Sequence, residues 1–241
     1  MMLYSNTNKT NKFNSVAIII PTYNEEKTLP RLLAKVLTAS TSGLKKEVIV
    51  IDDGSNDNTK QILEQFKKQI KILSHSHNKG KGASIRNGLK HTKSDIIIIQ
   101  DADLEYDPGE YSQLLKPILE HSADVVYGSR KLSGENPYSS PLFNFGGWLT
   151  TAIVNRLFRS NLTDVWTGYK IFNYNVISSI VLRCQRFEFC PEVTAKLLKK
   201  NIPIKEVPIT YRPRNEKEGK KIKIKDGIQA IWTLFRIRFI G

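Results

Sequence analysis

The sequence predicts a doubly wound α/β domain, with a mostly parallel central sheet flanked by helices, and three observations support this fold class. Short runs rich in Val and Ile alternate with segments of helical spacing through the first half of the chain. The runs are almost continuously apolar, as expected of parallel strands that helices cover on both faces. The chain has 241 residues, 40% hydrophobic and 25% charged. A chain of this size and composition buries a core without metals or disulfides.

Four apolar runs are predicted as the strands of this sheet. They are Ser15 to Ile20, Glu47 to Ile51, Lys71 to Ser74 and Ile96 to Ile99. Between them, Glu25 to Leu37 and Asn58 to Lys68 place their apolar residues on one helical face. The resulting βαβαβαβ pattern predicts right-handed crossovers and a ligand site outside the carboxyl ends of the strands.

The second half of the chain has a different texture. Leu142 to Leu157 is predicted as a bulky apolar helix, and Tyr211 to Lys225 carries seven Lys or Arg against two Glu. From Asp226 to Ile240, five large apolar residues share one helical face: Ile228, Ile231, Trp232, Phe235 and Phe239. We therefore expect a polar arm over residues 1–15, a catalytic domain over 16–225 and an amphipathic helix over 226–241, suited to a membrane interface.

The net charge of +14 indicates an anionic partner. Nucleic acid, an anionic membrane surface and phosphorylated substrates all fit this charge. The chain starts without a secretory signal, and no run approaches the roughly 18 apolar residues of a membrane span. Cys184 and Cys190 match neither a disulfide framework nor a zinc cluster. We expect a cytoplasmic protein, peripheral on the inner face of the membrane.

Carboxylates follow three of the four predicted strands. The loops are Pro21 to Glu25, Asp52 to Ser55 and Asp101 to Glu105. Because side chains alternate along an extended segment, Asp101 and Asp103 project to the same side and can share one ligand system. Mg²⁺ takes one or two protein carboxylates and completes its shell with waters and substrate phosphates. The pattern predicts a metal that bridges the protein and a diphosphate.

The three loops, in this order and each at a strand end, resemble the family 2 glycosyltransferases of the GT-A fold, which is Rossmann-like. The stretches DLEYDP, VVYGSR and VPITYRPR are similar to the branch of dolichyl-phosphate mannosyltransferase and bacterial polyprenyl-phosphate glycosyltransferases. The resemblance covers roughly residues 16–225.

The resemblance also implies roles for individual residues. Asp53 would read the nucleobase, Asp101 would lie beside the ribose, and Asp103 would bind the metal, Mg²⁺ or Mn²⁺. Asp101 and Glu105 would supply further oxygen ligands. Arg130 and Arg214 would face the diphosphate or the acceptor phosphate, as a guanidinium fork suits. The residues expected to contact the nucleotide are Pro21, Tyr23, Glu25, Ile51, Asp53, Asp101, Ala102, Asp103, Glu105, Arg130 and Arg214.

The implied reaction moves a sugar, mannose or glucose, from a GDP- or UDP-sugar to a polyprenyl or dolichyl phosphate with inversion. A hydroxyl acceptor would need a general base, whereas a phosphate is already ionised. Glu188 and Glu192 remain candidates for such a base. The enzyme would dock on the membrane peripherally or through a membrane-protein partner.

Two other functions stay open at this point. One is transfer by the same fold to a soluble saccharide or a protein side chain. The other is nucleic-acid binding, which the charge of +14 would serve. The acids at the strand ends and the lack of an aromatic RNA-reading pattern argue against it. Asn78 to Ala83, rich in glycine, is predicted as a loop near the nucleotide or as a plain turn.

Overall fold

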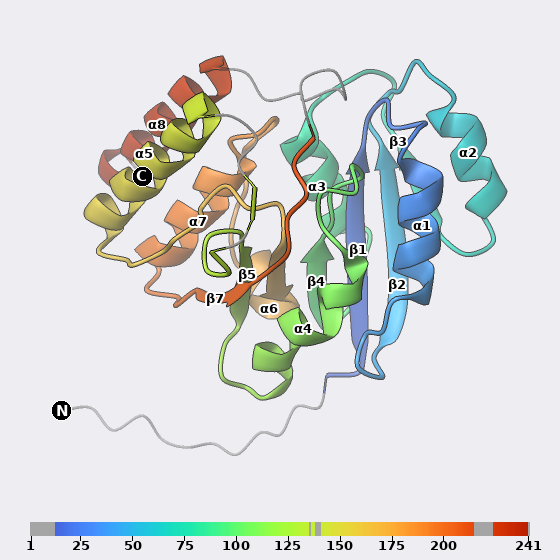
Figure 1. Ribbon diagram of the computed structural model, residues 1–241, viewed down its shortest axis with the longest axis horizontal. Helices are drawn as coiled ribbons and strands as arrows, with labels where there is room; N and C mark the ends of the chain where they lie inside the picture. Colours follow the sequence, from blue (N-terminus) through green and yellow to red (C-terminus); the bar gives the residue numbers. More distant parts are fainter. Residues whose placement is uncertain (1–12, 135, 138–140, 215–223, 241) are drawn as a thin grey trace.

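The computed structural model describes residues 13–134, 136–137, 141–214 and 224–240. The basic segment 215–223 and residues 1–12 of the expected polar arm lie outside this range. The described elements form an α/β fold with helices on both faces of one sheet (Figure 1), which confirms the predicted fold class.

The sheet has seven described strands in the order β3-β2-β1-β4-β6-β5-β7. All neighbouring pairs are parallel except those of β6, which runs antiparallel to β4 and to β5. The strands are β1 (Ser15–Thr22), β2 (Lys45–Asp52), β3 (Lys71–Ser74), β4 (Ile96–Ile99), β5 (Val125–Ser129), β6 (Lys170–Asn173) and β7 (Lys205–Pro208). The first four coincide with the predicted strands to within two residues at each end.

The helices match the predicted ones where the apolar spacing was regular. They are α1 (Leu29–Thr38), α2 (Thr59–Phe66), α3 (Lys81–Lys90), α4 (Tyr111–Leu119), α5 (Pro141–Phe158), α6 (Tyr174–Ser178), α7 (Phe189–Lys199) and α8 (Ile224–Phe239), with a short 3₁₀ turn at Pro108–Glu110. The first helix begins four residues later than expected, because residues 25–28 turn into it at Pro30, which suits a first helical turn.

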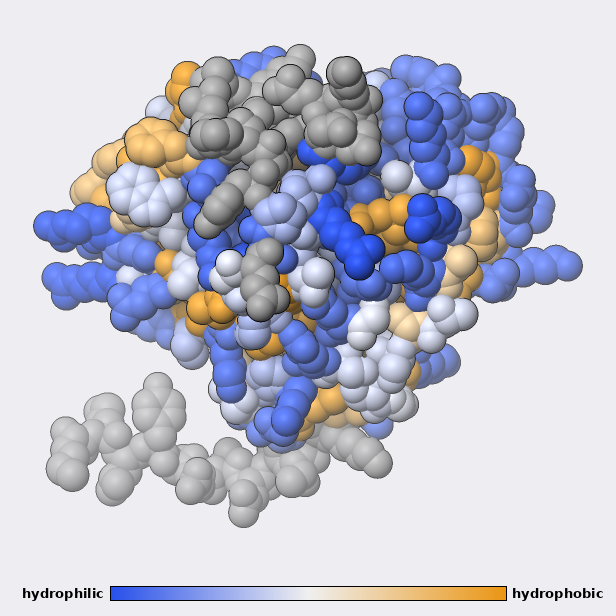
Figure 2. All heavy atoms as spheres, in the orientation of Figure 1, coloured by the Kyte–Doolittle hydropathy of each residue, from blue (hydrophilic) through white to orange (hydrophobic). Residues whose placement is uncertain are grey.

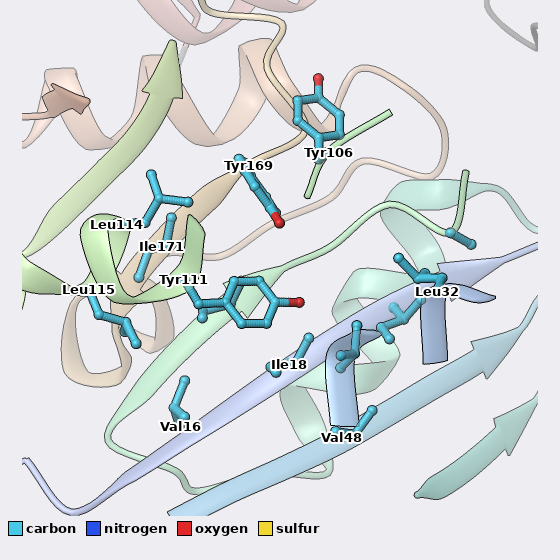
Figure 3. Close-up of a cluster of buried hydrophobic side chains, with 14 of the residues drawn as sticks. Val16, Ile18, Leu32, Val48, Tyr106, Tyr111, Leu114, Leu115, Tyr169 and Ile171 are labelled. Atoms are coloured by element: carbon cyan, nitrogen blue, oxygen red, sulfur yellow. The ribbon is translucent and has the colours of Figure 1, made fainter. Parts of the chain in front are cut away.

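Strand β1 shows how the sheet builds two cores. Val16, Ile18 and Ile20 point into one buried cluster, with α1 and α4 (Figure 3). Ala17 and Ile19 point into the other, with α3 and α7. All five side chains are fully buried, because successive residues of a strand face opposite sides.

A third, smaller cluster joins the long helices beside the sheet. Leu234 and Ile237 of α8 pack with Val154 of α5 and Ala195 of α7. The helix α8 therefore belongs to the folded body and buries one face, while its other face stays exposed. Figure 1 places α5 and α8 together at one end of the molecule. Among the described residues, no helix is long and apolar enough to cross a bilayer.

Candidate active site

The loops after β1, β2 and β4 meet at the carboxyl edge of the sheet and line a cavity of about 780 Å³. All but one of the residues expected to contact the nucleotide line it: Pro21, Tyr23, Glu25, Asp53, Asp101, Ala102, Asp103, Glu105, Arg130 and Arg214. Ile51 does not. Its side chain is fully buried against Gly88 of α3, on the face of β2 that points into the core.

Arg214 reaches into the carboxylates of the cavity from the far end of the chain. Its guanidinium lies 3.1 Å from Glu25 Oε2 and 3.1 Å from Asp103 Oδ2. Both carboxyl side chains are at most 15% exposed, and that of Arg214 is 16% exposed. The segment that carries Arg214 thus brings a positive charge to two loops that are more than 100 residues away in sequence.

Glu105 holds this segment in place. Its carboxylate accepts hydrogen bonds from the backbone N–H of Arg214 at 2.8 Å and from the hydroxyl of Tyr211 at 3.0 Å. Its backbone carbonyl accepts from the N–H of Arg212. Both carboxylate oxygens of Glu105 therefore have donors within the chain, so its role as a metal ligand stays a prediction.

Asp103 lies in a surplus of negative charge. Burial, together with the charges of Asp101 and Glu105, raises the pKa of its carboxyl to about 7 against the opposing effect of Arg214. A cation beside Asp103 would relieve this repulsion. The oxygen donors of the site suit Mg²⁺ or Mn²⁺, which prefer hard ligands.

The residues present fit a metal that is shared with a substrate. In the described part of the chain, no three His, Cys, Asp or Glu side chains group closely enough to hold an ion by themselves. Mg²⁺ in phosphate-transfer sites typically uses one or two carboxylates and takes its other ligands from phosphates and water. Asp101 and Asp103 would supply the protein's share.

Lys81 is a residue of the site that sequence reasoning did not single out. It is the first residue of α3, and its Nζ lies 2.5 Å from Asp101 Oδ1. Burial alone would lower the pKa of Lys81, but the charge and hydrogen bond of Asp101, together with the charges of Cys190 and Asp103, raise this pKa. Gly168 allows the arrangement, because a Cβ there would lie 2.2 Å from Asp101 Oδ2.

The glycine-rich loop does lie at the cavity, which Asn78, Gly80 and Lys81 line. The N–H groups of Gly82 and Ala83, in the first turn of α3, donate to the carbonyls of Arg186 and Gln185. These two N–H groups are consequently not available for a phosphate. The lysine, rather than the helix terminus, is the feature of this loop that suits an anionic ligand.

Arg130 is also paired within the cavity. Its guanidinium donates to both carboxylate oxygens of Asp164, at 2.6 and 2.7 Å, and stacks 4.9 Å from the ring centre of Tyr211. Burial alone would raise the pKa of the Asp164 carboxyl, but Arg130 outweighs it and holds that pKa below its usual range. Glu206 fixes this pair by accepting from the N–H groups of Thr163 and Asp164. No motif marks Asp164 in the sequence.

The other end of the cavity is apolar. Phe145, Gly147 and Leu149 of α5, Trp166, and Ile228 and Ile231 of α8 line it. Phe145, Trp148, Trp232, Phe235 and Phe239 are at least 45% exposed on the same two helices. Figure 2 shows apolar side chains gathered where Figure 1 places α5 and α8. The cavity thus runs from a carboxylate-rich end to an exposed apolar surface.

Glu188 and Glu192, the candidates for a general base, are both engaged in structure. Glu192 accepts from the N–H groups of Arg183 and Cys184 and pairs with Lys196. Glu188 accepts from the N–H groups of Gln185 and Arg186. Both are buried and hold the loop before α7.

Comparisons with known proteins agree with this geometry. An uncharacterized protein of Methanocaldococcus jannaschii is 31% identical over 85% of this chain and 84% of its own length. Dolichol-phosphate mannosyltransferase of Pyrococcus furiosus is 28% identical over 92% of this chain and 64% of its own length. Dolichyl-phosphate beta-glucosyltransferase ALG5A of Trichomonas vaginalis is 28% identical over 92% and 72%, respectively.

A solved structure shares the fold. It is glucosyl-3-phosphoglycerate synthase from Mycobacterium tuberculosis in complex with Mn²⁺, UDP and glucosyl-3-phosphoglycerate, with a TM-score of 0.75 and 17% identity over 93% of this chain and 80% of that one. The model of the family described as Glycosyl transferase family 2 matches residues 17–181. With the carboxylate loops at the sheet edge, this match shows that the chain is a glycosyltransferase and belongs to glycosyl transferase family 2.

Proposed function

We propose that this glycosyltransferase moves a hexose from a nucleoside diphosphate sugar to a polyprenyl or dolichyl phosphate at a membrane surface. The observation that carries the proposal is the two-ended cavity. One end offers carboxylates and cations for a metal-bound nucleotide, and the other offers apolar and aromatic side chains that lead to an exposed apolar face. A lipid phosphate likewise has a charged end, its phosphate, and an apolar end, its hydrocarbon chain.

The donor end has the groups that a diphosphate leaving group needs. A divalent metal on Asp103, with Asp101 beside it, would act as a Lewis acid toward the diphosphate. Arg214 and Lys81 line the same end and stabilise the negative charge that develops as the bond to the sugar breaks. Their guanidinium and ammonium groups are already held in place by carboxylates, so little reorganisation accompanies the reaction.

The transfer itself is a direct displacement. An oxygen of the acceptor phosphate attacks the anomeric carbon, the bond from this carbon to the diphosphate oxygen breaks, and the configuration inverts. The phosphate needs no base to activate it. This suits a site in which Glu188 and Glu192 are both engaged with backbone N–H groups.

The acceptor end offers a donor for the acceptor phosphate. Trp166 lines the cavity, and its indole N–H is buried without a hydrogen-bond partner in the part of the chain that the structure describes. Lys131 lines the cavity as well, and its Nζ donates to Asn144 of α5 at 3.1 Å. In this proposal, both groups bind an anion that enters from the side of the apolar lining of α5 and α8.

In this proposal, the exposed aromatic face of α5 and α8 also attaches the protein to the membrane. The exposed aromatic side chains of α5 and α8 would enter the interface, and Arg236 and Arg238 would face anionic headgroups. In this proposal, residues 16–225 form the catalytic domain and residues 226–241 dock it peripherally on the cytoplasmic face, alone or with a membrane-protein partner. The relatives named for dolichyl-phosphate transfer support the choice of acceptor.

A second candidate keeps the chemistry and changes the acceptor. The solved structure of similar fold was determined with glucosyl-3-phosphoglycerate, a soluble phosphorylated product. The soluble candidate leaves the exposed aromatic face of α5 and α8 without a role, so we place it second.

The test is a transfer assay with UDP-glucose and GDP-mannose, each with a polyprenyl phosphate in detergent or with 3-phosphoglycerate. We expect transfer to the lipid phosphate only. Asp103→Ala should reduce it by at least about a hundredfold, because the metal that Asp103 would hold stabilises the negative charge that develops on the diphosphate in the transition state. Glu64→Ala, on the exposed face of α2, is the matched control. Turnover with 3-phosphoglycerate alone would favour the second candidate, and activity of Asp103→Ala within a fewfold of wild type would refute the metal assignment.

A further inference from the structure

Asp53, at the end of β2, is held by an unusual number of donors for a residue that lines the cavity. Its Oδ1 accepts from His75 Nδ1 at 2.6 Å and from the N–H of Lys79 at 2.9 Å. Its Oδ2 accepts from the N–H of Gly80 at 2.7 Å. The side chains of Asp53 and His75 are only 4% and 8% exposed.

His75 is itself fixed from behind. Its Nε2 lies 3.1 Å from Asn87 Nδ2 on α3. An amide nitrogen can only donate, so Nε2 must accept, and the ring proton therefore sits on Nδ1 and is donated to Asp53. The backbone N–H of His75 also donates to the carbonyl of Asp52, at 2.9 Å. Asn87, His75 and Asp53 thus form a chain of hydrogen bonds from α3 to the cavity.

His75 and Asn87 can influence a ligand in the main cavity only through Asp53, because they do not line that cavity themselves. Asp53 lines the main cavity, whereas His75 and Asn87 line a second cavity of about 580 Å³. Gly54 lets the two loops meet, because its φ is +72° and a Cβ there would lie 2.7 Å from the backbone of His77. This close approach brings the β3–α3 loop onto the carboxylate.

The hydrogen bonds within the chain leave Asp53 able to accept only one more hydrogen bond. A carboxylate has about four lone-pair sites. Two donors occupy Oδ1 and one occupies Oδ2, so one site on Oδ2 remains for a ligand in the cavity. Guanine presents two adjacent N–H donors, which bind a carboxylate best when both oxygens are open. Uracil and thymine present one ring N–H between two carbonyls.

We propose that His75 and Asn87 are positioning residues for Asp53, and that they restrict the sugar donor to a nucleotide of the uracil or thymine class. The inference rests on the proposed function, in which Asp53 meets the nucleobase. The carboxylate is held at one angle with one open lone pair. A single ring N–H matches it, whereas a cytosine or adenine edge would bring a lone pair of its own against the carboxylate.

The test is calorimetric binding of UDP, GDP and inorganic diphosphate, each with Mg²⁺, to the full chain. The variants are His75→Leu, His75→Asn and Asn87→Leu. The matched control is His77→Leu, an exposed histidine of the same loop whose Nδ1 pairs with the hydroxyl of Ser76. Diphosphate lacks a base and therefore reports on the phosphate end alone. It also serves as a control for folding.

We expect the wild type to bind UDP at least about tenfold more tightly than GDP. His75→Leu should lose about tenfold or more of its UDP affinity, as for a hydrogen bond to a charged group, and keep its diphosphate affinity within twofold. Asn87→Leu should lose less. His75→Asn should retain most of the UDP affinity, because its amide nitrogen can replace Nδ1 as donor.

Three outcomes would overturn the inference. They are equal or tighter binding of GDP by the wild type, unchanged UDP binding by His75→Leu, and a parallel loss of UDP and diphosphate in that variant, which would indicate a merely structural role. Failure of the part of the proposed function on which this inference rests, a nucleoside diphosphate sugar as donor, looks different, because the wild type itself would then bind neither UDP nor diphosphate.

Discussion

At the scale of single residues, the most unusual side chain outside the carboxylate cluster is Lys170, the first residue of β6. It is fully buried, with its Nζ 3.0 Å from the carbonyl of Val165 and 3.5 Å from the ring centre of Tyr127. Burial lowers its pKa to about 8, although Cys190 and Asp164 partly oppose this effect. A charge that is disfavoured in the folded state destabilises the protein wherever the lysine is protonated.

We predict that Lys170→Met stabilises the protein at pH 7 and not at pH 10. The pKa is lower in the folded state than in the unfolded state, so the unfavourable contribution, about 3 kcal/mol, is complete below pH 8 and disappears as pH rises toward 10.5. After loss of the hydrogen bond to Val165, the net gain at pH 7 should be about 1 to 2 kcal/mol. Urea unfolding at the two pH values measures it.

The matched control for this prediction is Lys60→Met, at an exposed position of α2. It should leave the free energy of unfolding almost unchanged at both pH values. A gain for Lys170→Met of the same size at pH 7 and pH 10 would contradict the account, because it would then come from packing and not from charge.

Single residues also show how far sequence can lead. Asp53, Asp101 and Asp103 could be predicted because each lies within four residues of the end of a buried strand, and the strand itself sets its place. Lys81 and Asp164 could not, because their importance depends on partners that only the folded chain brings near. Ile51 does not line the cavity, since strand alternation turns its side chain into the core.

At the scale of elements, Leu142 to Leu157 was expected to form a bulky apolar helix and Asp226 to Ile240 an amphipathic one, and α5 and α8 lie at these positions. The structure adds that α8 buries Leu234 and Ile237 against its neighbours while it exposes Trp232 and Phe239 by 59% and 70%. Removal of the whole helix would therefore open the core and would not isolate membrane contact.

We predict that the double variant Trp232→Ser, Phe239→Ser lowers association with lipid vesicles by at least about tenfold and leaves the melting temperature nearly unchanged. Each aromatic ring would bury apolar surface in the interface, at about 25 cal/mol per Å². Flotation with vesicles measures the association. Val181→Ser, at an apolar position 73% exposed and outside these helices, is the control and should float like the wild type. Equal flotation of all three proteins would reject the docking face.

The strand β6 shows why part of the sheet escaped prediction. It has four residues, starts with a lysine and runs against its neighbours. A segment this short carries no alternation that distinguishes a strand from a loop. The first four strands were predictable because their apolar runs recur at regular intervals along the chain.

At the scale of the whole molecule, the net charge of +14 can be assigned to particular parts of the chain. The cations of the cavity contribute little to it, because Lys81, Arg130 and Arg214 are each paired with carboxylates. The excess therefore belongs mainly to the rest of the surface and to the basic stretch from Tyr211 to Lys225. Charge of that kind acts at long range and is weakened by salt.

We predict that vesicle association needs anionic lipid and weakens steeply as salt is raised from about 0.05 M to about 0.5 M, where the screening length falls to a few ångströms. Flotation across a salt series, with phosphatidylglycerol and with phosphatidylcholine vesicles, measures it. The double aromatic variant should lose the fraction that resists salt and keep the fraction that salt removes. Equal binding to both lipids at every salt concentration would contradict this view of the charge.

The contact between Arg214 and Glu25 has a consequence for how the enzyme is made. The two residues are 189 positions apart, so the pair cannot form until Arg214 has left the ribosome. The strands that carry the carboxylates can assemble earlier, since domains fold as they emerge. Closure of the long loop between the two residues comes late. A chain interrupted before Arg214 therefore has a sheet but no complete site, and catalytic competence comes only after this residue has folded onto the sheet edge.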